Sequence, residues 1–482
     1  MASKLLIIHG YSDGATSFTA LRDFFVESGA YPRDHVFLLN YDSLDDASTF
    51  EDFADKLDED YQKLFKGERI DVACHSTGAL VARAWLRLHY RRQREAGVKA
   101  PASPVEHLLM FAPANFGSDL ARLGQSFLGK FRSTFFNSNH QGDDFMESGK
   151  IVLQGLEPAS PFQWSLSADD LHGEGYFNTT LGGSKVCYPF IFAAGRAYGG
   201  LQGRLIPSRG KAGTDGTVRI CGTSLNTRKC VVDFARPAVK PAWIKERKHP
   251  VIPFAIFGEF THGSIVDVDA EFKGGVTSAG KLALDAIKVK TPGDYAALAS
   301  RFDEVHKQKH TGDDYQQFFF RVYDDVGFTV SDYYVDFYAM LPSGEIDEKL
   351  TAEFDKEFES EFTRHSADSS CRVLLLNVTN LRKYLQKLRQ ARARLVFDIT
   401  AKPPNREVKF LPGYAVVFDG AATMLANQPT FLYPNTTTLV EIVLNRVETD
   451  KVLHLLNHDL SKPPLPVAQP STSPTGRAAL LE

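Results

Sequence analysis

The chain has 482 residues, of which 43% are hydrophobic and 24% are charged, as in ordinary folded proteins and unlike disordered or fibrous ones. This length predicts two or three domains of roughly 100–200 residues each. The 55 basic and 59 acidic residues give a net charge of −4, which provides no basic field for nucleic acid and argues against such a partner.

The first 290 residues alternate short aliphatic runs with helical patterns, which is typical of crossover units and a mostly parallel sheet. Apolar side chains recur at helical spacing over 50–65 and 77–94, so we expect both helices to pack on the sheet. The predicted strands are 4–9, 35–39, 70–74, 107–112, 187–194 and 251–257.

The stretch 114–185 interrupts this alternation. It is rich in Gly, Ser, Asn and Phe and is too long for an ordinary connection, so we interpret it as an inserted lid or cap. Part of the 36 phenylalanines of the chain fall here, and they predict either a hydrophobic substrate pocket or a small core of the insertion itself. The pocket candidates are Phe116, Phe131, Phe135 and Phe136.

The second half reads differently, after a helix that Thr291 and Pro292 are expected to begin. Short strands predominate, at Phe318–Tyr323, Phe328–Tyr338, Val373–Val378, Leu395–Ile399 and Leu439–Leu444. Within 345–362, phenylalanines every four residues suit a helix stripe or one face of a strand, and we interpret the segment as a solvated amphipathic one. We predict an α/β domain over 1–310, a β-sandwich-like domain over 311–458 and a disordered Pro/Ser/Thr-rich tail over 459–482.

A serine lies between a predicted strand and a predicted helix, in the run Cys74-His75-Ser76-Thr77-Gly78. On such a turn the Ser76 hydroxyl is raised above the sheet edge, while the helix N-terminus directs N–H groups at developing negative charge. The pattern departs from G-x-S-x-G because Cys74 replaces the first glycine. A buried serine in an ordinary turn would give the same motif, so the motif needs support from elsewhere in the chain.

The first predicted strand ends in Ile8-His9-Gly10-Tyr11. A glycine at this place lets the backbone approach the serine. The backbone N–H groups of Tyr11 and Thr77 are therefore candidates for an oxyanion hole.

A nucleophilic serine requires a base and a carboxylate that orients the base. Asp215 follows the strand 187–194, and His262 follows the last predicted strand, so all three side chains can meet at one sheet edge. The order Ser, Asp, His is that of the α/β-hydrolases. His172 and His249 are alternatives to His262, and Asp233 and Asp267 are alternatives to Asp215.

In these motifs the chain resembles α/β-hydrolases of the lipase and esterase type. The matching pieces are Ile7–Tyr11, Cys74–Arg83, Phe111–Ser118, Thr214–Val218 and Thr261–Gly263, and the second half is not covered. The resemblance implies Ser76 as nucleophile, His262 as base, Asp215 as its orienter and Tyr11 and Thr77 as oxyanion donors.

The expected function is hydrolysis of carboxylic esters with a hydrophobic acyl chain, with a phospholipid or an acylglycerol as candidate substrate and with peripheral contact to a lipid surface. Acyl transfer to an alcohol would use the same residues. Two other interpretations stay open: a binding protein whose C-terminal β domain docks to a lipid or polymer, and a catalytically silent scaffold. The mechanism needs no cofactor, and no spacing of acidic residues indicates a metal site.

Cysteine usage and the N-terminus bear on the compartment. The five cysteines include no Cys-x-x-Cys pair, which argues against a disulfide framework or a zinc site, although a single Cys221–Cys230 bridge stays open. The first apolar run, Leu5–Ile8, is too short for a signal sequence, and no run reaches the ~20 apolar residues that cross a bilayer. We therefore expect a cytoplasmic protein, and secretion without a signal would leave the same pattern.

Overall fold

The structure is a computed structural model. It describes residues 3–10, 18–39, 48–123, 150–173, 175–181, 186–199, 212–234, 242–243, 250–358, 362–401, 413–414, 432–444 and 446–447.

A six-stranded parallel sheet forms the first half of the molecule, in the order β2-β1-β3-β4-β5-β8. Each of the six strands predicted in the first 290 residues is found in it, so the predicted mostly parallel sheet is confirmed. The strands are β1 (Leu5–Ile8), β2 (Val36–Leu39), β3 (Ile70–His75), β4 (Val105–Phe111), β5 (Tyr188–Ala194) and β8 (Phe254–Phe257).

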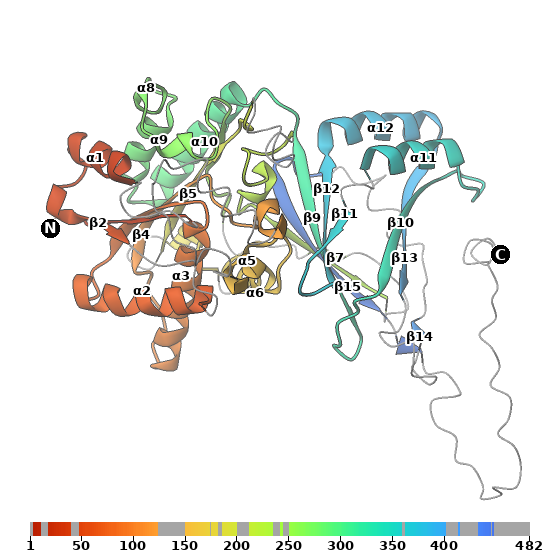
Figure 1. Cartoon of the computed structure of the whole chain (residues 1–482), viewed down its shortest axis with the longest axis horizontal. Coiled ribbons are helices and arrows are strands. Elements are labelled where there is room, and N and C mark those ends of the chain that lie inside the picture. The colour runs from red at the N-terminus through yellow and green to blue at the C-terminus, as the bar shows by residue number, and fades with distance from the viewer. Residues whose placement is uncertain are drawn as a thin grey trace, which may run out of the picture.

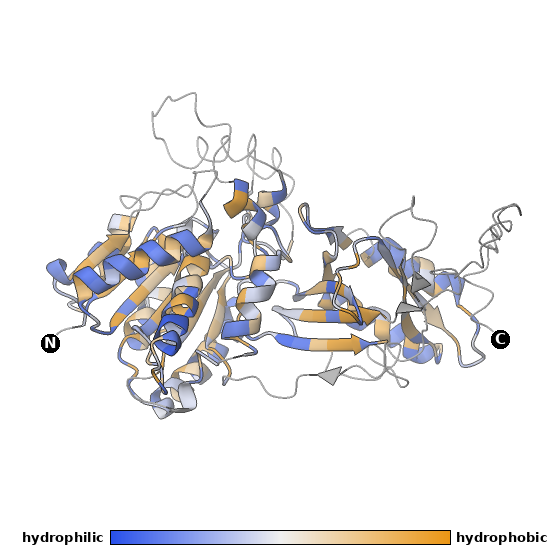
Figure 2. Cartoon of the chain, turned by 90° about the horizontal axis from the view of Figure 1, so that it is seen from below, coloured by the Kyte–Doolittle hydropathy of each residue, from blue (hydrophilic) through white to orange (hydrophobic). Residues whose placement is uncertain are grey.

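Helices cover both faces of this sheet (Figure 1), as parallel strands require. One face packs against α1 (Thr19–Glu27), α8 (Ala270–Lys273), α9 (Ala279–Ala286) and α10 (Pro292–Lys309). The other face packs against α2 (Phe50–Phe65) and α3 (Gly78–Glu95). Figure 2 shows the resulting layers, with apolar strands between helices whose outer faces are polar.

Capping residues in the sequence fix where two of these helices begin. The Thr49 side chain accepts a hydrogen bond from the Asp52 amide, and the Asp52 carboxylate accepts one from the Thr49 amide, which forms a capping box at the start of α2. The same arrangement joins Thr291 and Asp294 at the start of α10, with Pro292 in the first helical position. The predicted helix start at Thr291 and Pro292 is confirmed.

The described part of the predicted insertion is packed into the domain. It contains α5 (Lys150–Leu156), α6 (Pro161–Asp170) and the short 3-10 helices η3 (Asp119–Leu123) and η5 (Thr179–Leu181). Its apolar side chains belong to the same core as α2 and α3, among them Val152, Leu156, Trp164, Leu166 and Phe177. These elements therefore pack against α2 and α3 as part of the first domain.

A second, mixed six-stranded sheet has the order β11-β12-β9-β15-β6-β7. Its strands are β6 (Arg228–Asp233), β7 (Ala242–Trp243), β9 (Tyr315–Asp324), β11 (Phe362–Arg364), β12 (Cys371–Asn377) and β15 (Thr436–Leu444). Two further antiparallel pairs join β10 (Tyr333–Met340) to β13 (Arg394–Ala401) and β14 (Gly413–Tyr414) to β16 (Arg446–Val447). The second half is β-rich, as predicted.

The prediction of a β-sandwich-like domain over 311–458 omits two helices of the second half. They are α11 (Glu348–Phe358) and α12 (Val378–Gln390), and they lie side by side in Figure 1. Phe354 and Phe358 of α11 are buried against the sheet, so the segment interpreted as solvated is an amphipathic helix with a packed face. The remaining short 3-10 helices are η2 (Arg33–His35), η8 (Ile220–Gly222) and η9 (Ser264–Val266).

The central strands β9 and β15 of the second sheet contribute to two cores, since alternate side chains of a strand point to opposite sides. Phe319 and Leu439 pack into the core that contains α2 and α3, whereas Phe318 and Val440 pack with α11 and α12. The sheet also includes β6 and β7, which precede the predicted boundary at residue 310. The domain limits at 310 and 458 stay a prediction.

Two observations concern the cysteines and the helices. All five cysteines are free and buried. Among the described residues, no helix combines the length and the apolarity that crossing a bilayer requires.

Candidate active site

Ser76 occupies a strained turn between β3 and α3. Its φ of 54° lies in the left-handed region, which costs a residue with a side chain about 1–3 kcal/mol. Backbone hydrogen bonds hold the turn: the Ser76 amide donates to Phe111 O (3.2 Å), and the Ala114 amide donates to Ser76 O (3.0 Å). The strain is therefore imposed by the sheet edge around it.

The residues that flank the turn fit its close packing. A Cβ on Gly78 would lie 2.6 Å from His9 O and 2.7 Å from Ile8 O, so only glycine allows α3 to approach β1 this closely. Cys74, which replaces the first glycine of G-x-S-x-G, is 1% exposed and packs in the core on one face of the sheet. This position therefore accommodates a small side chain.

Three predicted site residues form one chain of hydrogen bonds. Nε2 of His262 lies 2.9 Å from Ser76 Oγ, and Nδ1 of His262 lies 2.8 Å from Asp215 Oδ2. All three side chains are buried, with Asp215 fully inaccessible. With Asp215 ionised, Nδ1 carries the proton and Nε2 is left to accept from the serine hydroxyl.

The carboxylate of Asp215 is fixed by its own loop. Its Oδ1 accepts hydrogen bonds from the backbone amides of Thr217 (2.9 Å) and Val218 (2.8 Å). The same loop also binds the backbone of the histidine, because the His262 amide donates to Asp215 O at 3.1 Å. Oδ2 is thereby left facing the imidazole.

Of the two predicted oxyanion donors, one can be placed. Thr77 immediately precedes α3, at the end of the helix where amide groups have no helical acceptor. Within the described part of the chain, its amide donates no hydrogen bond. Tyr11 lies outside the described residues.

One of the four phenylalanines predicted to line a substrate pocket lies among the described residues. Phe116 is a core residue, 1% exposed, whose ring contacts Phe319 edge to face at a centroid distance of 5.6 Å. Phe131, Phe135 and Phe136 lie outside the described residues. Phe116 thus joins the first domain to the second sheet.

Three of the four alternative acids and bases lie among the described residues. Nε2 of His172 lies 3.1 Å from Thr227 Oγ1, and Asp233 belongs to β6 of the second sheet. Asp267 follows η9, and His249 lies outside the described residues. Within the described chain, His262 is the histidine that is hydrogen-bonded to Ser76.

A buried arginine, to which the sequence assigned no role, ties the nucleophile helix to its surroundings. The fully buried Arg83 of α3 makes a two-pronged ion pair with Asp170 of α6, at 2.7 and 3.2 Å, and donates to Asn115 O at 2.9 Å. The Asn115 side chain in turn donates to Thr223 O at 2.7 Å. Burial raises the pKa of Asp170 despite the charge of Arg83, so the pair is a costly feature that holds α3, α6 and the loop after β4 together.

One group of metal-ligating side chains occurs among the described residues, formed by Asp71, Glu106 and His107. Nδ1 of His107 lies 2.6 Å from Asp71 Oδ1, and Nε2 lies 2.6 Å from Val289 O. Because a carbonyl can only accept, Nε2 carries a proton, and both ring nitrogens are engaged within the protein. The group is better described as a buried hydrogen-bond network.

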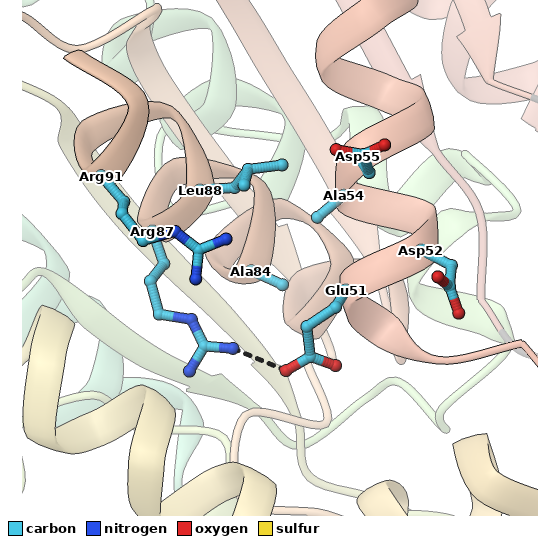
Figure 3. A pocket seen from close by; sticks show the side chains of 8 residues that line it. All are labelled: Glu51, Asp52, Ala54, Asp55, Ala84, Arg87, Leu88 and Arg91. Atoms are coloured by element: carbon cyan, nitrogen blue, oxygen red, sulfur yellow. Dashed lines mark hydrogen bonds and ion pairs between the residues drawn. The ribbon is translucent and has the colours of Figure 1, made fainter. Parts of the chain in front are cut away.

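A small cleft between α2 and α3 is seen in Figure 3. Its volume of about 190 Å³ is below the few hundred Å³ of typical ligand pockets. Arg87 of α3 forms an ion pair with Glu51 of α2 across it, at 2.7 Å. None of Ser76, Asp215 and His262 lines it, and we assign it no role.

Comparison with known proteins bears on the fold. No protein-family model and no curated protein sequence matches the chain. Among solved structures, phospholipase PlaB from Legionella pneumophila is similar over 98% of this chain and 99% of its own, with a TM-score of 0.78 and 22% identity. A second structure of that protein, in complex with thio-NAD, is similar over 95% and 96%, with a TM-score of 0.74 and 22% identity.

A structure of lipase BlEst2 from Bacillus licheniformis in its mature form matches 56% of this chain and 89% of its own, with 17% identity and a TM-score of 0.34. The parallel sheet, its two helical layers and the likeness to PlaB along the whole chain agree with one architecture. The chain has the α/β-hydrolase fold, extended by a second, β-rich half.

Proposed function

We propose that the protein is a serine hydrolase that cleaves carboxylic esters with a hydrophobic acyl chain. The observation that carries this proposal is the hydrogen-bonded chain from Ser76 through His262 to Asp215, on a strained strand-to-helix turn. A sharp strand-to-helix turn presents the serine hydroxyl at the edge of the sheet, as a nucleophile requires.

The proposed reaction begins with attack of Ser76 Oγ on the ester carbonyl carbon, while Nε2 of His262 takes the hydroxyl proton. Asp215 stabilises the imidazolium that forms, and the Thr77 amide, with that of Tyr11, donates to the oxyanion. The tetrahedral intermediate collapses, the alcohol leaves with the proton from Nε2, and the acyl group stays on Ser76. Water then attacks the acyl-enzyme by the same steps and releases the acid.

A lipid substrate is proposed on two grounds. The fold is shared over the whole chain with a protein that is described as a phospholipase. The near-neutral net charge also suits uncharged or zwitterionic esters better than polyanions. We therefore propose a phospholipid or an acylglycerol as the natural substrate, with hydrolysis as the reaction in water and transfer to an alcohol available when one is supplied.

The test is a comparison of the wild type with Ser76→Ala and with Ser300→Ala, which changes a serine on the exposed side of α10. Ser76→Ala should lower kcat by about 10⁴-fold or more, because a triad member is removed. Ser300→Ala should be unchanged. Substrates are p-nitrophenyl esters of increasing chain length and phosphatidylcholine vesicles.

A fluorophosphonate probe gives an independent readout, because it reacts with an activated serine whatever the natural substrate is. The wild type and Ser300→Ala should be labelled, and Ser76→Ala should not. Equal labelling of all three proteins would overturn the assignment of Ser76. Turnover that is confined to the shortest esters would overturn the lipid substrate but not the serine mechanism.

A further inference from the structure

A single peptide bond next to the predicted base is held from both of its ends. The His262 carbonyl accepts a hydrogen bond from Nε2 of His75 at 2.9 Å, and the Gly263 amide donates to the Tyr198 hydroxyl at 3.2 Å. These two groups belong to one planar peptide unit and point in opposite directions. Hydrogen bonds on both sides restrain the rotation and displacement of this peptide.

The first contact comes from the nucleophile turn itself. His75 immediately precedes Ser76, and its side chain is 4% exposed. Its ring lies between those of His262 and Phe18, at centroid distances of 4.7 and 5.6 Å. Since the His262 carbonyl can only accept, His75 carries a proton on Nε2. The turn that presents the serine therefore also fixes the backbone that presents the imidazole.

The second contact comes from the loop after β5. The Tyr198 ring lies against Gly216, the residue that follows Asp215, where a Cβ would come within 2.0 Å of Tyr198 Cδ2. Gly216 also has a φ of 94°, which disfavours any other residue. Through its ring and its hydroxyl, Tyr198 thus contacts both the loop of Asp215 and the loop of His262.

We propose that His75 and Tyr198 are positioning residues, which clamp the His262–Gly263 peptide and so hold the imidazole between Asp215 and Ser76. The inference rests on the proposed serine hydrolase function. The imidazole must exchange a proton with Ser76 and with the leaving group without losing Asp215, and a displacement of about 1 Å can cost about 100-fold in rate.

The variants separate the clamp from simple packing. His75→Leu removes the donor, and Tyr198→Phe removes the hydroxyl acceptor but keeps the ring. Each should lower kcat and the rate of fluorophosphonate labelling by about 10-fold, with KM changed less than about 2-fold, because substrate contacts stay intact. His75→Gln keeps an amide N–H at a similar reach and should recover most of the lost rate.

Both contacts act on one peptide, so their effects should not multiply. The double variant His75→Leu with Tyr198→Phe should lose clearly less than the product of the two single losses. A purely multiplicative loss would overturn the shared clamp. The same conclusion would follow if His75→Gln were as slow as His75→Leu in a folded protein.

Tyr295→Phe is the matched control. Its hydroxyl donates to Pro189 O at 2.9 Å, near the start of β5, whereas Tyr198 follows the end of that strand. It should lower thermal stability without changing kcat. If His75→Leu does not fold, His75→Gln and Tyr198→Phe still test the clamp, and wild-type rates in Tyr198→Phe would overturn it.

Ser76→Ala distinguishes failure of the proposed function from failure of the clamp alone. If Ser76→Ala keeps wild-type activity and labelling, the proposed function fails. If it is inactive while His75→Leu and Tyr198→Phe are labelled at the wild-type rate, only the clamp fails.

Discussion

Two buried polar residues lie at the two ends of β3: Ser76 just beyond its end, and Asp71 as its second residue. Asp71 is 2% exposed, and its carboxylate accepts hydrogen bonds from Ser3 (2.8 Å) and Tyr31 (2.7 Å) and contacts His107. Burial alone would raise the pKa of Asp71, but the hydrogen bonds from His107, Tyr31 and Ser3 hold that pKa below its usual value. A buried charge is therefore stabilised at the sheet edge opposite the site.

This residue predicts a specific dependence of stability on pH. Because the folded-state pKa of Asp71 is lowered, its stabilising contribution is fully present above the unfolded-state pKa of about 3.9 and is lost as the pH falls through the folded-state value. Asp71→Asn should destabilise the protein by about 3 kcal/mol near pH 7. The difference in thermal midpoint between wild type and Asp71→Asn should be constant above about pH 5 and should shrink below pH 4. A difference that grows in acid would contradict the assignment.

At the scale of single elements, β9 packs into the cores of both halves of the molecule. Its alternate side chains serve two cores: Phe319 faces α3 and the insertion, whereas Phe318 and Phe320 face the helices of the second half. One strand thus stabilises both domains at the same time.

Phe319→Ala should therefore destabilise the first domain as well as the second. Removal of a fully buried phenylalanine costs about 3–5 kcal/mol. Phe328→Ala, at a ring that is 65% exposed, should change stability by less than about 1 kcal/mol. Thermal unfolding of both variants, monitored by circular dichroism, checks this. Equal midpoints would contradict a shared core at β9.

The sequence predicts these elements with unequal success, for physical reasons. The inner strands of the first sheet are buried on both faces and so read as mainly apolar runs, whereas the edge strand β2 is half-buried. Capping residues fix the start of α2 and α10. Helix α12 is missed, although Val378, Leu381, Tyr384 and Leu388 are spaced for one buried helix face and Asn377 caps it. The helical spacing is present in the sequence, but α12 begins directly after β12, so no loop residues mark where the helix starts.

Long-range contacts could not be predicted in the same way. The pairing of β6 with β15 joins segments about two hundred residues apart, and nothing local in either strand specifies its partner. The placement of Ser76, Asp215 and His262 follows from their motifs, whereas Tyr198 carries no motif and acquires its contacts only when three loops meet.

At the scale of the whole molecule, the second sheet and the first sheet share one hydrophobic core. It packs one face on the core of the first domain, and β6 and β7 enter it from between β5 and β8 of the first sheet. A C-terminal domain that served only for docking would be removable, whereas this packing predicts that the second half is required for the first to fold.

Deletion of residues 311–482 should therefore abolish turnover of soluble esters as well as any surface binding, because β6 loses β15 and the face of the first core is exposed. A truncation after residue 458, which removes only the predicted tail, is the control and should keep turnover. Soluble expression and fluorophosphonate labelling of both proteins give the measurement. A soluble, active 1–310 fragment would contradict this view.

The path of the chain has a consequence for how such a protein can evolve. The backbone leaves the first sheet after β5, contributes β6 and β7 to the second sheet, returns for β8 and leaves again for β9. No single crossover point in the gene separates the two halves. Neither half can therefore be exchanged by recombination as one continuous segment. Asp215 and His262 are encoded on either side of the first excursion, and the two halves should therefore be inherited, and should diverge, as one unit.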